Sequence, residues 1–94
     1  MLRLALSPRF MRCYSRLSRT DQQFCEAAIE ALPEIFGHPH RHAGLGLRRA
    51  LRRGVYECRP TQAVRIGFTR HGEILLLQIV GNHDTIRAGL RSHA

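Results

Sequence analysis

The residues of this chain with the clearest chemical potential are Arg59, Arg65 and His83, all in its second half. A guanidinium can bind a phosphate through two parallel hydrogen bonds, and an imidazole gains and loses a proton near neutral pH. Cleavage of a phosphodiester by a 2′-hydroxyl requires a base, an acid and stabilisation of charge on the phosphate. We therefore predict RNA cleavage, with the two arginines stabilising the phosphate and His83 acting as acid or base.

The spacing of these residues also brings a carboxylate into the candidate catalytic site. Apolar side chains occupy every second position of 63–69, so Arg65 is expected to point to the opposite face of a strand. The same alternation over 54–59 places Glu57 and Arg59 on the face of Arg65. We count Glu57 among the candidate catalytic residues. The alternative is a surface arginine pair with a histidine in a turn.

A dense basic cluster precedes these strands. Its members are Arg48, Arg49, Arg52 and Arg53. The segment is either a short helix, in which residues three and four apart share a face, or an extended approach to the sheet. Contacts from such arginines to a nucleic-acid backbone are independent of sequence and sensitive to salt. We predict that the cluster binds RNA, the alternative being a solvated basic run.

The overall charge supports a polyanionic or acidic partner. The chain has 15 cationic residues, all arginine, against seven acidic ones, which gives a net charge of +8 and a pI near 11.2. Arginine binds phosphate in a planar, two-pronged way and also stacks on bases. A strongly basic small domain is typical of proteins that bind nucleic acid or an acidic protein.

Metal chemistry has weaker support in the sequence. His38, His40 and His42 alternate as zinc ligands sometimes do, but they lie in a segment rich in glycine and proline, with no evident fourth ligand. We therefore predict no metal site. The three cysteines form no CxxC pair and are expected to be buried and reduced.

The first half of the chain is predicted to form a strand and two helices. Residues 2–6 alternate weakly and suggest a short edge strand. Ser7 and Pro8 are typical of a helix cap and a first helical position. Thr20 and Gln23 fit a capping box, so a second helix is expected to begin there.

The second half is predicted to form the sheet. Strands are expected at 54–59, 63–69 and 73–80, the last apolar on both faces and therefore central, with one helical turn over 85–91. The order β-α-α-β-β-β predicts a single α+β domain over residues 1–94, with a helical hairpin packed on one face of the sheet. No run of 18 apolar residues occurs, and the apolar stretch at the N-terminus is short for a signal peptide. We expect a cytoplasmic protein.

Several of these segments together resemble the RelE/ParE superfamily, the toxins of bacterial type II toxin–antitoxin pairs. The matching segments are GLGLRRAL before the sheet, GVYECR and AVRIGF in the middle strands, and LLLQIVGNHD at the end. The element order over 2–80 matches as well, so the resemblance covers nearly the whole chain. It implies a small twisted antiparallel sheet with a helical hairpin on one face.

The resemblance also implies function and partners. Many RelE-like members cut mRNA on the ribosome without a metal or other cofactor, and ParE-like members instead poison DNA gyrase. The expected partners are a cognate acidic antitoxin, the ribosome and mRNA, with no membrane and with DNA contacted only through the antitoxin. Two alternatives stay open: a ParE-like gyrase poison, and a non-enzymatic module that binds RNA or an antitoxin.

The family's functional residues match this chain in part. Arg59 and Arg65 match arginines on the open sheet face of RelE-like enzymes, and His83 matches a C-terminal histidine that some members use as general acid or base. Glu57 stands where many members have a basic residue, and the catalytic lysines of some members are absent. Asp84 replaces an aromatic residue that stacks on a base in other members.

Overall fold

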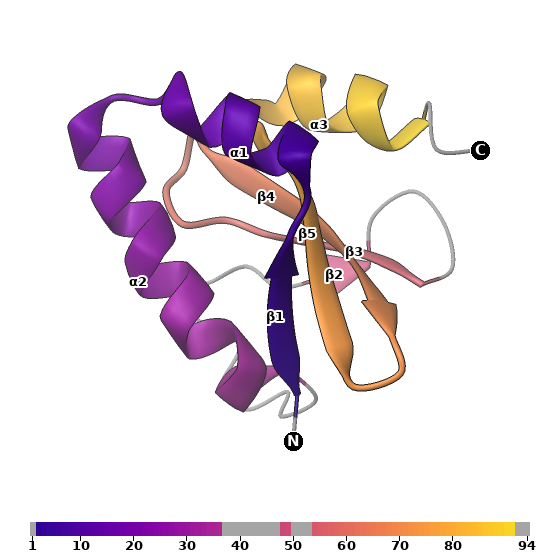
Figure 1. Ribbon diagram of the computed structural model, residues 1–94. Helices are drawn as coiled ribbons and strands as arrows, with labels where there is room; N and C mark the ends of the chain where they lie inside the picture. Colours follow the sequence, from indigo (N-terminus) through magenta and orange to yellow (C-terminus); the bar gives the residue numbers. More distant parts are fainter. Residues whose placement is uncertain (1, 37–47, 50–53, 92–94) are drawn as a thin grey trace.

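The computed structural model describes residues 2–36, 48–49 and 54–91, which form three helices and five strands (Figure 1). In chain order these elements are β1 (Arg3–Leu6), α1 (Pro8–Ser15), α2 (Arg19–Ile35), β2 (Arg48–Arg49), β3 (Val55–Cys58), β4 (Arg65–His71), β5 (Ile74–Gly81) and α3 (His83–Arg91).

The strands form one sheet in the order β1-β5-β4-β3-β2. The predicted α+β fold is confirmed, with a helical hairpin on one face of the sheet. The sheet is mixed rather than wholly antiparallel, because β1 pairs with β5 in parallel while the other neighbours are antiparallel. Alternation within a segment predicts which residues form a strand, but it carries no information on the direction of the neighbouring strand.

The strands β4 and β5 are joined by the tightest connection in the sheet. His71 pairs with Ile74, which leaves Gly72 and Glu73 as a two-residue loop. Gly72 has a φ of 62°, a conformation that a side chain would strain. A glycine with positive φ at the first loop position is typical of a type II′ turn, which matches the twist of the flanking strands.

The two N-terminal helices begin at serine caps. The Ser7 hydroxyl accepts a hydrogen bond from the Phe10 N–H at 3.0 Å, as the sequence predicted. The predicted capping box of the second helix is wrong, because Ser18 caps α2 and accepts from the Asp21 N–H at 3.1 Å. Both serines and threonines can cap a helix, and Ser18 comes first along the chain.

The main core lies between α1, α2 and one face of the sheet. Phe10, Cys25 and Leu32 from the helices pack in one cluster with Ile66 and Phe68 of β4, all of them at most 1% exposed. The apolar positions of 63–69 therefore face the helices, as their alternation predicted.

The second face of the sheet is partly covered by α3. Ile86 of α3 is 1% exposed and packs with Val55 and Ile79. The predicted single turn over 85–91 is thus a longer helix that begins at His83, where the Asn82 side chain accepts from the Thr85 N–H at 2.8 Å. The described helices include none with the length and apolar character needed to cross a bilayer.

Candidate functional site

The structure brings Arg59, Arg65 and His83 to one end of the sheet. Arg59 follows the last residue of β3, Arg65 is the first residue of β4, and His83 begins α3 just after β5. Both β3 and β5 are antiparallel to β4, so the end of β3, the start of β4 and the end of β5 coincide. The register is consistent with this, since Arg65 pairs with Gly81 of β5.

Glu57 and Arg65 form an ion pair on the face of the sheet away from α1 and α2. Arg65 Nη1 lies 3.0 Å from Glu57 Oε1. Glu57 is opposite Gly67, two residues beyond Arg65, so the pair is diagonal across β3 and β4. The predicted sharing of one face by these two residues is therefore observed.

The ion pair is largely removed from solvent. The side chain of Arg65 is 13% exposed and that of Glu57 is 5% exposed. Within the part of the chain that the structure describes, Arg65 Nε is buried and has no hydrogen-bond partner. An unsatisfied buried donor costs free energy, and a buried ion pair is often no more stable than an apolar pair of similar volume. Stability alone therefore does not account for charges at these two positions.

Arg59 and His83 differ from this pair because both are exposed. His83 is the first residue of α3, and the positive end of a helix dipole favours anions at this position. Asp84, also exposed in the first turn, adds one negative charge there. The solvent-accessible part of the site therefore combines a guanidinium, an imidazole and a helix N-terminus, groups that suit a phosphate and proton transfer.

Half of the predicted RNA-binding cluster can be placed. Arg48 and Arg49 form β2 at the edge of the sheet, where they pair with Glu57 and Tyr56 of β3. The extended alternative therefore holds for these two residues rather than the helical one. Arg52 and Arg53 lie outside the described residues, as do His38, His40 and His42. The described residues contain no group of three or more side chains suited to a metal ion.

Sequence reasoning missed two features of the site. The first is the burial of Glu57. The alternating pattern predicts on which face of the strand this charged residue lies, but not that its side chain is buried. The second is the cover provided by α3. Ile86 and Leu90 are spaced four apart in the last segment of the sequence, which is a signal for a helix with an apolar side.

Comparison with known proteins identifies the fold. No protein-family model and no curated protein sequence matches the chain. Among solved structures, a copper-bound mutant toxin from Helicobacter pylori aligns with a TM-score of 0.72 and 19% identity, over 89% of this chain and 97% of that one. YafQ from E. coli strain BL21(DE3) aligns with a TM-score of 0.73 and 10% identity, over 92% and 98% of the two chains.

A third solved structure includes a partner. The toxin in a RelB–RelE antitoxin–toxin complex from Methanococcus jannaschii aligns with a TM-score of 0.68 and 14% identity, over 89% of this chain and 95% of that one. At these identities the likeness establishes a RelE-like fold, which agrees with the resemblance seen in the sequence.

Proposed function

We propose that this chain is the toxin of a type II toxin–antitoxin pair and acts as a ribosome-dependent mRNA endoribonuclease. The observation that supports the proposal is that Arg59, Arg65 and His83 lie at the same end of neighbouring strands in a RelE-like sheet. These are the residue types that phosphodiester cleavage without a metal requires. The ribosome as the place of action implies the cytoplasm.

The role proposed for each residue follows from the solvent exposure of its side chain. Arg59 is exposed and binds the scissile phosphate directly. His83 is exposed at the start of α3, where it transfers a proton to or from the reacting oxygen atoms. Arg65 adds positive charge from the floor of the site. Glu57, 5% exposed and paired with Arg65, positions that guanidinium instead of exchanging protons with the substrate.

The basic cluster and the charge of the chain have a place in the same proposal. Arg48 and Arg49 on β2, together with Arg52 and Arg53 of the sequence, dock on ribosomal RNA. With a net charge of +8, the chain is attracted to RNA over long distances, and the attraction weakens as salt is added. The protein partner in this proposal is a cognate antitoxin, by analogy with the antitoxin–toxin complex from M. jannaschii.

The test is expression of the chain alone in bacteria, with mRNA ends mapped by primer extension. We expect growth arrest and new cuts within translated codons. Replacing His83 or Arg59 with alanine should lower cleavage roughly a hundredfold or more. The matched controls are His71→Ala, at the far end of β4, and Arg3→Ala, at the start of β1, which pairs with Ile74 at that same far end; both residues are exposed.

The other outcomes identify the alternatives. Growth arrest with intact mRNA that persists in the His83→Ala variant would contradict the nuclease and favour a gyrase poison. No arrest on expression of the folded chain would favour a module that only binds RNA or an antitoxin.

A further inference from the structure

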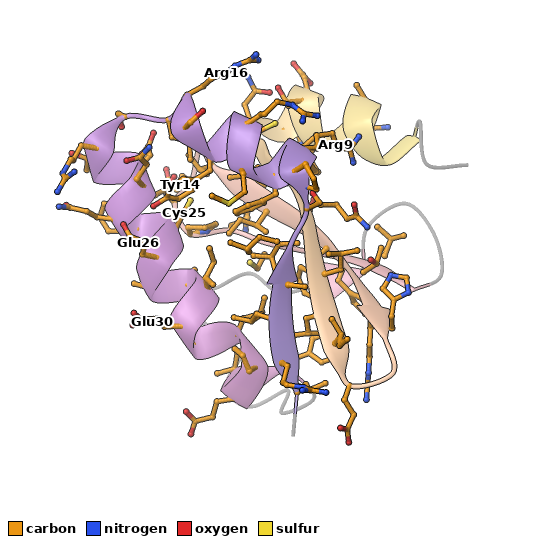
Figure 2. The ribbon with its side chains drawn as sticks, in the orientation of Figure 1. Arg9, Tyr14, Arg16, Cys25, Glu26 and Glu30 are labelled. Carbon is orange, nitrogen blue, oxygen red and sulfur yellow. The ribbon has the colours of Figure 1, made fainter. Side chains whose placement is uncertain are left out.

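A groove of about 310 Å³ lies on the helical side of the molecule, and none of its lining residues belongs to the candidate site described above. Its walls come from β1, α1 and α2. The lining residues are Leu6, Phe10, Met11, Tyr14, Glu26, Ile29 and Glu30. Figure 2 shows Glu26 and Glu30 following one another along α2, with Tyr14 of α1 beside that helix. The proposed nuclease activity uses none of these residues.

The apolar part of the groove is exposed to an extent that the fold does not require. Leu6 is 44% exposed and Met11 is 48% exposed, two of the four large hydrophobic residues that the described part of the chain leaves exposed. Exposed, concave apolar surface of this kind often marks a binding site.

The groove is held open by contacts between its two helices. The Gln22 side-chain amide donates to the Tyr14 carbonyl oxygen at 3.0 Å, and the Tyr14 hydroxyl donates to the Gln22 carbonyl oxygen at 3.4 Å. These contacts fix α1 against α2, so the groove exists before a partner binds and little free energy is lost in forming it.

The rim of the groove is acidic, in contrast to the rest of this basic chain. Glu26 and Glu30 are both exposed and stand four residues apart on α2, a spacing at which like charges repel. In the described ranges neither carboxylate forms an ion pair with a cationic side chain. The repulsion between the two carboxylates weakens the free helix and is relieved by a cation from outside.

We propose that this groove binds an amphipathic helix of a partner protein that carries basic residues beside its apolar face. Apolar side chains one turn apart would enter between Leu6, Met11 and Ile29, the usual way in which a helix occupies a groove. Basic residues four apart on that helix would meet Glu26 and Glu30. If the proposed toxin function holds, the helix belongs to the antitoxin, whose contact here is basic even where the rest of it is acidic.

The test uses two fluorescein-labelled helical peptides of about 20 residues, a length at which isolated helices form. One has leucines at helical spacing flanked by two arginines four apart, and its twin has glutamates in place of these arginines. Fluorescence anisotropy measures their binding to the full chain. We expect the arginine peptide to bind at least about tenfold more tightly, a preference that charge complementarity supplies.

The net charge of the chain makes this comparison stringent. At +8, long-range attraction favours the glutamate twin, so a preference for the arginine peptide must come from the groove itself. Glu26→Gln/Glu30→Gln should remove the preference. Glu73→Gln/Asp84→Asn changes the net charge by the same amount by removing two carboxylates, but at exposed positions that do not line the groove. This control should retain the preference.

Methyl resonances in NMR spectra locate the contact, and those of Leu6, Met11 and Ile29 should move on binding of the arginine peptide. Equal or tighter binding of the glutamate twin, absence of binding, or shifts confined to other residues would each overturn the proposal. Self-association of the chain through the groove in sedimentation experiments would assign the groove to a second copy instead. Because the readout is binding, a chain without toxicity leaves this test intact, and failure here leaves the nuclease proposal standing.

Discussion

Glu57 and Arg65 form a largely buried ion pair on the face of the sheet away from α1 and α2. The alternation of β3 and β4 predicts that they share a face, and they do. It does not predict the 3.0 Å contact or the small exposure of both side chains, because burial depends on α3 and on the neighbouring strands. The sequence does predict the exposed positions of Arg59 and His83, since polar residues at strand ends need no further packing to reach solvent.

The buried pair leads to a prediction about stability. Glu57→Gln leaves the Arg65 guanidinium largely buried without its counter-ion, and we expect a loss of roughly 3 kcal/mol in the free energy of unfolding. Replacing both residues, as Glu57→Leu/Arg65→Met, should recover most of this loss because the buried guanidinium is then removed together with its counter-ion. Urea unfolding measures both effects.

Glu26→Gln is the control for this prediction. Glu26 is an exposed carboxylate, and its replacement should change the free energy of unfolding by less than about 0.5 kcal/mol. If Glu57→Gln costs no more than this control, the pair contributes nothing to the fold and the positioning role of Glu57 loses its physical basis.

At the scale of elements, the sequence predicts most of the fold. Periodicity of two identifies β3, β4 and β5, and the Ser7-Pro8 pair identifies the start of α1. Helix ends and strand direction are less well specified, because several nearby residues can serve as caps and because pairing is decided by the remaining chain. The length of α3 was underestimated since its buried residue, Ile86, packs against strands distant in the sequence.

The start of α2 gives a test that separates the two caps. Ser18→Ala removes the side chain that accepts from the Asp21 N–H, and we expect a loss of about 1 kcal/mol in the free energy of unfolding. Thr20→Ala replaces a β-branched residue inside the first turn with a better helix former, so it should be neutral or slightly stabilising. Thermal or urea unfolding of the two variants measures the difference. A larger loss for Thr20→Ala would restore the predicted capping box.

At the scale of the whole molecule, two surfaces differ in charge and polarity. The basic end of the sheet suits a nucleic acid, whereas the apolar groove with Glu26 and Glu30 lies on the helical side. If both proposals hold, this small domain offers RNA and a protein partner different residues. An antitoxin that inhibits the proposed cleavage would then need, besides a helix in the groove, a further segment that reaches Arg59 and His83.

The core between these surfaces contains two buried thiols, which lead to a prediction about alkaline pH. Burial raises the pKa of the Cys25 thiol from 9.0 to about 11 and that of Cys58 to about 12, with smaller contributions from nearby acidic groups. Below pH 9 each thiol is protonated in both the folded and the unfolded chain, and stability does not depend on it. Above pH 9 the unfolded chain releases these protons while the folded chain retains them.

Stability should therefore fall as pH rises above about 9, by up to about 1.4 kcal/mol per pH unit for each thiol. The chain contains no lysine, so lysine titration cannot mask the effect. Urea unfolding under reducing conditions at pH 7, 9 and 10 measures it. Cys25→Ala should lower stability at pH 7 but reduce the decline at higher pH, whereas Leu32→Ala, equally buried, should lower stability and keep the full decline. An identical decline in both variants would mean that the Cys25 thiol does not hold its proton in the folded core.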